Sequence, residues 1–402
     1  HQVGLLFIDL DGFKKVNDAL GHNAGDDLLK EVAVRLGACV RQDDTIARLG
    51  GDEFTVILPY IHGPNDTEIV AKKIIERVRE PIYLGESEVY ISASIGITLY
   101  PDDAEDEETL IKHADTAMYE AKAAGRRTYK FFTANMNQAA QEKMALESEL
   151  RTAIERGEFD IRYQPIIDLK NGKITGTEAL VRWNHPVRGI TSPDVFIPLA
   201  EEQGLIVPIG EWVFRQACQM AHHWRESGRN DLQMAINISP RQCQEPGFEE
   251  MVDRILDETQ LPPSSVTLEI TESLFIEGAD ESAVTALHNR RSKGTLLSLD
   301  DFGTGYSSLS YLKRFPVDVL KIDREFVADV TTAPEDQALC RAVIAMAHAF
   351  NLDVVGEGVE TIEHARVLRD MGCDRAQGYL ISKPLTVDDL EVFLNDWPGI
   401  SL

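Results

Sequence analysis

Two adjacent carboxylates followed by a glycine-rich stretch are the residues of this chain most suited to chemistry. Asp300 and Asp301 follow an apolar segment, 295–299, that predicts a buried strand, and the glycine-rich stretch continues to Ser308. Adjacent carboxylates raise each other's pKa unless a cation lies between them, and Mg²⁺ favours such oxygen ligands. An isolated Asp-Asp-x-Gly is more often a strand-to-loop turn in which one aspartate caps the next element. The ends of the other strands decide between these two interpretations.

Polar residues recur at the ends of the other predicted strands of the second half. Short β-rich segments are expected at 159–163, 173–177, 232–236, 266–268, 295–299, 318–320, 352–356 and 374–376. Helical patterns, including 199–226, separate most of them, which predicts a (β/α)₈ barrel, a fold whose catalytic groups gather at the C-terminal strand ends. The residues that follow these segments are Gln164, Glu178, Asn237, Glu269, Asp300, Lys321, Glu357 and Gln377. This repeated register favours a site over a set of isolated turns.

The residue types at these positions define a chemistry. The predicted metal ligands offer only oxygen atoms, which suits Mg²⁺ or Mn²⁺ rather than zinc: Glu178, Asn237, Glu269, Asp300, Asp301 and Glu357. So many carboxylates require about two divalent ions, and two ions roughly 3.5–4 Å apart suit in-line attack of water on a phosphodiester. Lys321 is expected to stabilise negative charge on the phosphate or to orient that water.

The first half carries two further acidic clusters. Its strands and helices mix without strict alternation, which predicts an α+β domain with a mainly antiparallel sheet. Asp9 ends the first predicted strand with Asp11 two residues on, and Asp52-Glu53 occupy the turn between strands expected at 45–49 and 54–58. Neighbouring strands would bring these acids together as a divalent-metal site. Composition alone favours the plainer interpretation of acidic surface turns.

A pair of basic residues supports a phosphate ligand in this half. Lys122 and Arg126 are four residues apart at the end of a predicted helix, 107–124, so that they share one face and can hold phosphates. The alternative is the ordinary enrichment of basic residues at helix C-termini.

The net charge and composition limit the classes of partner that this chain is expected to bind. The 402 residues carry a formal net charge of −27, which argues against nonspecific binding to nucleic acid or to anionic membranes. A phosphate-bearing substrate stays compatible when metal ions mediate the contact. Five scattered cysteines without Cys-x-x-Cys, no apolar run of membrane length and no signal peptide predict a cytoplasmic location. The chain begins with His1 almost directly before a strand, so we expect a fragment whose upstream sensor or membrane anchor lies outside it.

The predicted domains are residues 1–132 and 158–402, joined by a linker at 133–157. A helix is expected from Met136 to Ile154, with apolar Met144, Leu146 and Leu150 among polar residues. Two roles remain open for it: a connector packed on one domain, or a signalling helix between two. Because no Pro-rich or low-complexity stretch occurs, stiff coupling is expected.

The first half resembles the GGDEF diguanylate cyclase family, through Arg48 to Phe54 (Arg-Leu-Gly-Gly-Asp-Glu-Phe) and the preceding segment 7–18. The resemblance implies a nucleotide-cyclase-like palm fold that joins two GTP into cyclic di-GMP and acts as a homodimer. The family's helical segment before the first strand is absent from this chain. The roles implied are Mg²⁺ binding with GTP by Asp9 and Asp52, catalysis by Asp52 and Glu53, guanine contacts by Asn17 and Asp26, phosphate contacts by Lys122 and Arg126, and an inhibitory product site at Arg41 and Asp44.

The second half resembles the EAL family of cyclic di-GMP phosphodiesterases, through Glu178-Ala179-Leu180-Val181-Arg182 and further motifs in family order: 237–242, 269–272, 300–308, 321–323, 356–360 and 377–379. The resemblance implies a TIM-type barrel with one reversed strand, two metal ions and the linear product pGpG. The six oxygen ligands above would bind metal, with Lys321, Glu178, Asp300 and Asp301 catalytic. The remaining implied roles are substrate contact by Gln164, Arg182 and Gln377, control of the 300–308 loop by Glu272, and support of the site by Asp323 and Glu360.

Three functions follow from these observations. The first is a cyclic di-GMP phosphodiesterase whose GGDEF half binds GTP and regulates it. The second is a bifunctional enzyme with net diguanylate cyclase activity. The third is a non-catalytic cyclic di-GMP receptor, which the full set of predicted metal ligands disfavours. The predicted main activity of this chain is hydrolysis.

Overall fold

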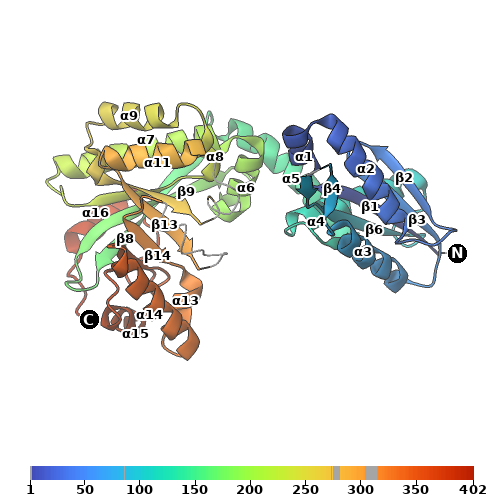
Figure 1. Ribbon diagram of the computed structural model, residues 1–402. Coiled ribbons are helices and arrows are strands. Elements are labelled where there is room, and N and C mark those ends of the chain that lie inside the picture. The colour runs from blue at the N-terminus through green and yellow to red at the C-terminus, as the bar shows by residue number, and fades with distance from the viewer. Residues whose placement is uncertain (1, 86, 273, 275–280, 304–314) are drawn as a thin grey trace. The chain divides into compact units, whose positions relative to one another are not determined.

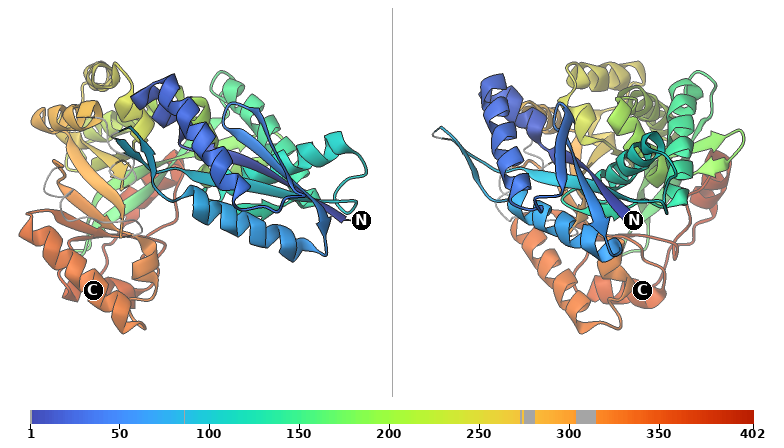
Figure 2. Two further views of the ribbon diagram at one scale, coloured as in Figure 1. Left: turned by 45° about the vertical axis from the view of Figure 1, so that its right-hand side comes forward. Right: turned by 90° about the vertical axis from the view of Figure 1, so that its right-hand side faces the viewer.

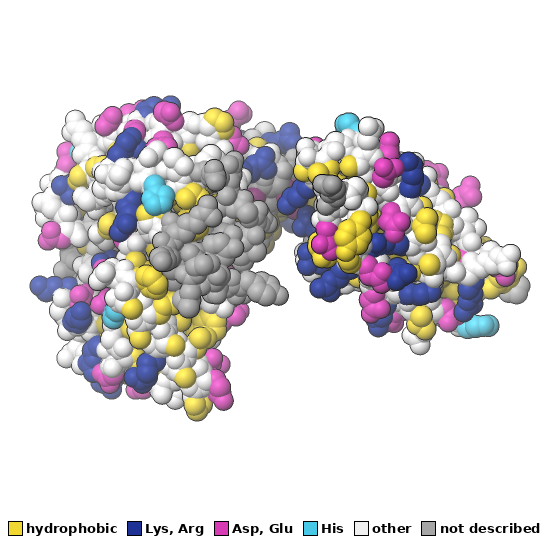
Figure 3. All heavy atoms as spheres, viewed as in Figure 1, with side chains coloured by type: hydrophobic (Ala, Val, Ile, Leu, Met, Phe, Trp, Pro, Cys, Tyr) yellow, Lys and Arg dark blue, Asp and Glu magenta, His cyan; other side chains and the backbone are white. Residues whose placement is uncertain are grey.

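The computed structural model describes residues 2–85, 87–272, 274, 281–303 and 315–402. The chain forms two compact units, residues 1–145 and 146–402, and each is considered by itself. On the face shown in Figure 3, acidic and basic side chains are interspersed over both units. None of the helices in the described residues has an apolar stretch long enough to cross a bilayer.

A five-stranded sheet in the order β2-β3-β1-β6-β7 forms the centre of the first unit (Figure 1). Its strands pair antiparallel, except that β6 and β7 run parallel, as the predicted α+β class requires. A separate small hairpin is formed by β4 and β5. The bounds are β1 Gln2–Asp11, β2 Thr45–Gly50, β3 Glu53–Ile61, β4 Ile82–Leu84, β5 Ser87–Val89, β6 Ser92–Tyr100 and β7 Tyr129–Phe131.

Helices cover both faces of this sheet because β1 is apolar on both sides. Leu6 and Ile8 pack into the main core with α2 and α3, whereas Leu5 and Phe7 pack against α4 on the opposite face. Figure 2 shows the helices along the sheet. The bounds are α1 Phe13–Leu20, α2 His22–Gly37, α3 Pro64–Val78 and α4 Glu107–Ala123.

One helix, α5 (Ala134–Ala153), begins in the first unit and ends in the second. In its first half, Asn137 Nδ2 lies 2.8 Å from Nε2 of His113 on α4. In its second half, Leu146, Leu150 and Ala153 are buried in the core of the second unit. Of the two roles left open for this segment, packing on a single domain is therefore wrong. The first half of α5 contacts the first unit, and its second half is part of the core of the second unit.

The second unit is a closed eight-stranded barrel with an additional edge strand. The sheet order is β10-β9-β11-β12-β13-β14-β15-β16-β8, and pairing of β8 with β9 closes it. All pairs from β9 to β16 around the barrel are parallel, whereas β8 is antiparallel to both of its neighbours, which confirms the reversed strand. The bounds are β8 Phe159–Asp168, β9 Ile174–His185, β10 Gly189–Thr191, β11 Gln233–Asn237, β12 Val266–Thr271, β13 Leu296–Phe302, β14 Val319–Ile322, β15 Asp353–Gly356 and β16 Arg375–Gln377.

One predicted helix of the barrel is divided in the structure. The single helix expected at 199–226 is two helices, because Gly204 adopts a left-handed φ of 75° that ends α6 before α7 begins. The bounds are α6 Pro193–Gln203, α7 Ile206–Glu226, α8 Pro240–Gln244, α9 Phe248–Glu258, the 3₁₀ helix Pro263–Ser265, α11 Glu281–Ser292, α13 Arg324–Ala328, α14 Pro334–Ala349, α15 Ile362–Asp370 and α16 Val387–Asp396.

The prediction that every polar site residue directly follows its strand was wrong at several positions. Glu269, Asp300 and Lys321 lie inside β12, β13 and β14, and Glu178 lies well inside β9. Barrel pairing continues past the apolar run that marks a strand in the sequence, because alternate side chains can be polar where they point into the site. Gln164 lies in the middle of β8, whose reversed direction takes its own C-terminal end away from the site.

Candidate active sites

The centre of the barrel site is the ammonium of Lys321, which is only 1% exposed. Its Nζ atom lies 2.6 Å from Glu357 Oε1, 3.0 Å from Glu269 Oε2, 3.3 Å from Asp300 Oδ1 and 3.6 Å from Glu178 Oε2. These carboxylates come from four different strands or strand ends. The structure therefore brings together residues that the sequence spreads over 180 positions from Glu178 to Glu357, counting both ends.

Burial and mutual repulsion govern the charge of this cluster. Burial, reinforced by the neighbouring carboxylates and opposed by Lys321, raises the pKa of Glu269 well above its usual range and that of Glu357 to about 8. Burial alone would lower the pKa of Lys321, but its carboxylate neighbours outweigh that effect and raise it. Lys321 therefore stays charged, while burial and mutual repulsion favour the protonated forms of Glu269 and Glu357.

Two amides fix the orientation of Glu178. Asn237 Nδ2 donates to Glu178 Oε1 at 2.6 Å, and Gln377 Nε2 donates to Oε2 at 2.6 Å. Burial opposes ionisation of Glu178, but Lys321 and these hydrogen bonds outweigh it and lower its pKa. Gln377 Nε2 also donates to Gln164 Oε1 at 3.1 Å, and Gln164 donates in turn to the Ser382 carbonyl. Gln377 thus holds Glu178 directly, and Gln164 holds Gln377.

Three carboxylates beside this cluster are arranged to share a cation. Asp300, Asp301 and Glu357 each place one oxygen atom within 4.8 Å of the others. Burial, followed by the charges of Asp300 and Asp323, raises the pKa of Asp301 to about 6. An all-oxygen donor set of this kind fits Mg²⁺ or Mn²⁺, so the residues present agree with the predicted cofactor. Asp323 also caps α13, because its Oδ1 accepts from the Glu325 N–H at 2.7 Å.

Three other predicted residues of this half contact backbone groups or are exposed. Arg182 is half-buried and donates to the Val181 carbonyl at 2.8 Å. Glu272 Oε2 accepts from the Gly303 N–H at 3.4 Å, at the start of the loop it was predicted to hold. Residues 304–308 of that loop lie outside the described residues. Glu360 is exposed on the segment after β15.

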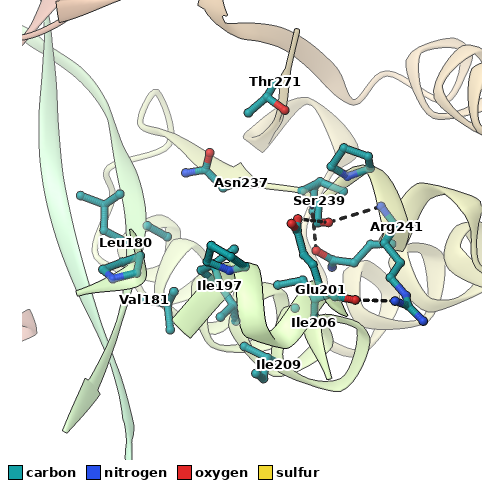
Figure 4. Close-up of a pocket in the computed structure, with 18 of the residues that line it drawn as sticks. Leu180, Val181, Ile197, Glu201, Ile206, Ile209, Asn237, Ser239, Arg241 and Thr271 are labelled. Atoms are coloured by element: carbon teal, nitrogen blue, oxygen red, sulfur yellow. Dashed lines mark hydrogen bonds between the residues drawn. The ribbon is translucent and has the colours of Figure 1, made fainter. Parts of the chain in front are cut away.

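A cavity of ≈ 1140 Å³ adjoins this centre, with Asn237 and Asp301 in its wall. Figure 4 shows Ile197, Ile206 and Ile209 of α6 and α7 along its apolar side, opposite Thr271 and Asn237. The strand after Glu178 also contributes lining residues, Ala179, Leu180 and Val181. A ligand held here would have its polar part next to the carboxylates and flat apolar faces against the isoleucines.

A group in the cavity wall was missed from the sequence. Ser239, two residues after Asn237, donates its hydroxyl to Glu201 Oε1 at 2.6 Å and accepts from the N–H of Arg241 to cap α8. The dashed lines in Figure 4 mark these contacts. The signal for the cap was present, since Ser239 and Gln242 form a capping box, but nothing local indicated Glu201 as a partner.

The acidic residues of the first unit also meet, on the face of the sheet that α4 covers. Asp9 and Glu53 are direct cross-strand partners, and Asp52 lies in the β2–β3 turn with its carbonyl accepting from the Leu10 N–H at 3.3 Å. Lys122 Nζ lies 2.6 Å from Asp9 Oδ2. Burial raises the pKa of Asp9 more than Lys122 lowers it. The predicted metal residues and one phosphate residue are therefore adjacent.

A carboxylate missed by the sequence reasoning borders this site. Burial, followed by the charge of Asp115, raises the pKa of Glu53. Asp115 lies on α4 two helical turns before Lys122, on the same helix face, and its own pKa is raised by burial. That spacing was the available signal.

The residues expected to contact guanine lie on two consecutive helices, Asn17 on α1 and Asp26 on α2. The Asn17 amide packs so closely on Gly25 that a Cβ there would lie 1.8 Å from its Oδ1, which is buried without a hydrogen-bond partner. Arg41 and Asp44 form the turn before β2, where Asp44 Oδ2 accepts from the Arg41 N–H at 2.6 Å.

Comparison with known proteins follows this division into two units. The family model described as the EAL domain matches residues 147–384, and that described as the diguanylate cyclase GGDEF domain matches residues 1–128. MucR of Pseudomonas aeruginosa, described as a bifunctional diguanylate cyclase/cyclic di-GMP phosphodiesterase, is 46% identical over 390 residues, 97% of this chain and 57% of MucR. PdeR of Escherichia coli, described as a cyclic di-GMP phosphodiesterase, is 43% identical over 385 residues, 96% of this chain and 58% of PdeR.

Solved structures of EAL proteins are also similar to this chain. The PaMucR phosphodiesterase in complex with cyclic di-GMP is 41% identical, with a TM-score of 0.59, and the match covers 61% of this chain and 99% of that chain. The EAL enzyme Bd1971 bound to cAMP and cyclic di-GMP is 29% identical, with a TM-score of 0.62 and coverage of 87% and 92%. The chain belongs to the EAL family, and within it to the proteins in which a GGDEF domain precedes the EAL domain. It spans about half the length of the curated relatives it matches.

Proposed function

We propose that the second unit hydrolyses cyclic di-GMP to linear pGpG in a reaction that requires two divalent cations. The observation that carries this proposal is the convergence of four carboxylates on buried Lys321, with Asp301 completing a three-carboxylate group beside them. The relatives described as phosphodiesterases support the substrate class.

Each side chain has a distinct task in this reaction. Asp300, Asp301 and Glu357, with Glu178, Glu269 and Asn237, would hold the cations, which supply Lewis-acid activation of the attacking water and of the phosphate. Lys321 places a fixed positive charge where the phosphate gains negative charge in the transition state. Asn237 and Gln377 keep Glu178 in one orientation, so little reorganisation accompanies the reaction.

The cavity next to the carboxylates supplies the substrate-binding surface. Its isoleucine side suits a purine face, and Arg182, on the strand that carries Glu178, is the proposed phosphate contact. The direct test is the rate of conversion of cyclic di-GMP to pGpG in Mg²⁺, in Mn²⁺ and in EDTA. Hydrolysis in Mg²⁺ or Mn²⁺ that EDTA abolishes is expected. Binding of cyclic di-GMP without turnover under every condition would instead identify a receptor.

For the first unit, we propose GTP binding that regulates hydrolysis. The supporting observation is the adjacency of Asp9, Glu53 and Lys122 with the Gly50–Glu53 turn, which matches the diguanylate cyclase family. Net cyclase activity by a homodimer is the second candidate, and the description of MucR as bifunctional favours keeping it. GTP added to the hydrolysis assay separates the two. Faster loss of cyclic di-GMP indicates regulation, and formation of cyclic di-GMP from GTP alone indicates a cyclase.

A further inference from the structure

Asp11, the last residue of β1, has a different environment from the neighbouring site carboxylate Asp9. Its side chain is 7% exposed. Oδ2 accepts from the Ser92 hydroxyl at 2.7 Å, and Oδ1 accepts from the Ser94 hydroxyl at 2.8 Å. Both serines lie on β6, which pairs with β1. The sequence placed Asp11 in a metal-binding acidic cluster, but the structure gives its oxygens to hydrogen-bond donors.

The other contacts of Asp11 come from the turn that follows α4. The Arg127 N–H donates to Asp11 Oδ2 at 3.4 Å, and Arg126 Nε lies 3.9 Å from Oδ1. With the two serine hydroxyls, these groups approach the roughly four acceptor positions that a carboxylate offers. Metal coordination by Asp11 would require displacing some of these donors.

This turn is conformationally demanding. Gly125, Arg126 and Arg127 have φ angles of 103°, 61° and 53°. The left-handed region costs energy for residues with a Cβ, so two consecutive arginines there need external contacts to persist. Asp11 supplies such contacts from the sheet through a backbone N–H and a guanidinium. The Arg126 side chain nevertheless remains 64% exposed and accessible to a ligand.

The arrangement forms two parallel pairs on one strand face. Asp9 and Asp11, two residues apart on β1, point to the same side of the sheet, where they meet Lys122 and Arg126 respectively. Asp9 contacts Lys122 at 2.6 Å on the helix itself, whereas Arg126 lies beyond the helix end and depends on the turn for its position.

We propose that Asp11 is a positioning residue for nucleotide binding, which holds the 125–127 turn so that Arg126 joins Lys122 in binding the phosphates of GTP. This role rests on the proposed binding of GTP by the first unit. It goes beyond that proposal by assigning to Asp11 an action through Arg126 rather than through metal.

The test is a double-mutant cycle on GTP affinity with the whole chain. Parent, Asp11→Asn, Arg126→Ala and the double variant are titrated with GTP, each in Mg²⁺ and in EDTA. Asp11→Asn is expected to weaken GTP binding roughly ten- to hundredfold, the size of a lost charge-assisted hydrogen bond. The loss should occur with and without Mg²⁺, and the double variant should bind no more weakly than Arg126→Ala.

A matched variant guards against loss of folding. Ser94→Ala removes one donor to Asp11 without touching the turn, so it should weaken GTP binding in the same direction by a smaller factor. The thermal unfolding of each variant shows whether the first unit remains folded. Hydrogen exchange of residues 125–128 should increase in Asp11→Asn.

Several outcomes would overturn the role of Asp11. They are unchanged GTP affinity in Asp11→Asn, a loss confined to Mg²⁺, which would indicate a metal ligand, and losses that add fully in the double variant. GTP binding by the parent with any of these results leaves the nucleotide role of the unit standing. Absence of GTP binding by the parent overturns both that role and the one inferred for Asp11.

Discussion

Lys321 lies where three β-strands and the end of a fourth bring carboxylates within 3.6 Å of one ammonium, and this contact network sets the electrostatics of the site. One fixed positive charge offsets only part of the negative charge around it. Burial and the remaining negative charge raise the pKa of Glu269 and Glu357, and further cations would relieve the same repulsion, which suits a metal-dependent reaction. Glu178 is the member held by the most amide donors.

Replacing Glu178 should therefore remove more than one ligand oxygen. Glu178→Ala removes the acceptor of the Asn237 amide and one of the two acceptors of the Gln377 amide, and it opens a gap beside Lys321. Hydrolysis of cyclic di-GMP is expected to fall at least roughly a hundredfold, the upper range for loss of a second-shell partner. The exposed Glu363 offers a matched Glu→Ala control that should keep the parent rate. Appreciable turnover by Glu178→Ala in saturating Mg²⁺ would refute the assignment of the site.

The raised pKa values predict how stability depends on pH. In the folded state the pKa of Asp301 is about 6 and that of Glu357 is about 8, both above the values in the unfolded chain. Their contribution to stability is therefore complete below about pH 4.5 and is lost as the pH rises through the folded pKa values. In EDTA, the Tm of the second unit should fall as pH rises from about 4.5 through about 8. Mg²⁺ should reverse this fall, since divalent cations replace the protons.

Calorimetry at several pH values checks this dependence, with Glu357→Gln as the control. An amide at this position carries no proton to lose, so the variant should show a shallower fall between pH 6 and 8 in EDTA. An increase of Tm over this range in EDTA would contradict the assigned direction of the shifts.

The helix α5 crosses the boundary between the two units of the chain. Its first half hydrogen-bonds to α4, and its second half contributes Leu146, Leu150 and Ala153 to the barrel core. Two polar contacts reinforce this second half: His185 Nε2 lies 2.9 Å from Glu149 Oε2, and exposed Arg151 donates to Gln203 on α6. The helix is therefore part of the barrel's structure after Ala145.

Truncation of a core residue in this half should affect the second unit alone. Leu150 is 1% exposed, so Leu150→Ala is expected to destabilise the second unit by about 2–5 kcal/mol. Met144 is 71% exposed, and Met144→Ala should change stability by no more than about 0.5 kcal/mol. Denaturant unfolding followed separately for each unit measures both. A Leu150→Ala effect as small as that of Met144→Ala would show that the helix end does not pack in the core.

The proposed regulation of hydrolysis by GTP requires a path between the two units. A ligand shifts an equilibrium only through different affinities for its states, so GTP must favour one arrangement of the chain. The helix that begins on one unit and ends in the core of the other is the segment through which such a preference would pass.

Breaking α5 at the unit boundary should therefore remove the GTP effect. Ala145 is exposed, so a proline there disrupts the helix without removing a buried side chain. Ala145→Pro is expected to keep the hydrolysis rate measured without GTP and to lose acceleration by GTP, whereas Ala145→Ser should retain both. Full GTP acceleration in Ala145→Pro would exclude α5 as the connection.

Much of this protein follows from local sequence. The eight barrel strands, the β2–β3 turn and the helix from 107 to 123 were predictable because apolar periodicity and glycine placement act over a few residues. The candidate site residues could be selected for the same reason, because each lies next to one of these short segments. What only the tertiary structure decided is how these residues meet. Lys321 lies among carboxylates from distant strands, and Glu178 is held by Asn237 and Gln377, because barrel closure fixes contacts that no local pattern encodes. Asp11 shows the same limit: sequence spacing grouped it with Asp9, but the pairing of β1 with β6 and the turn after α4 gave it other partners.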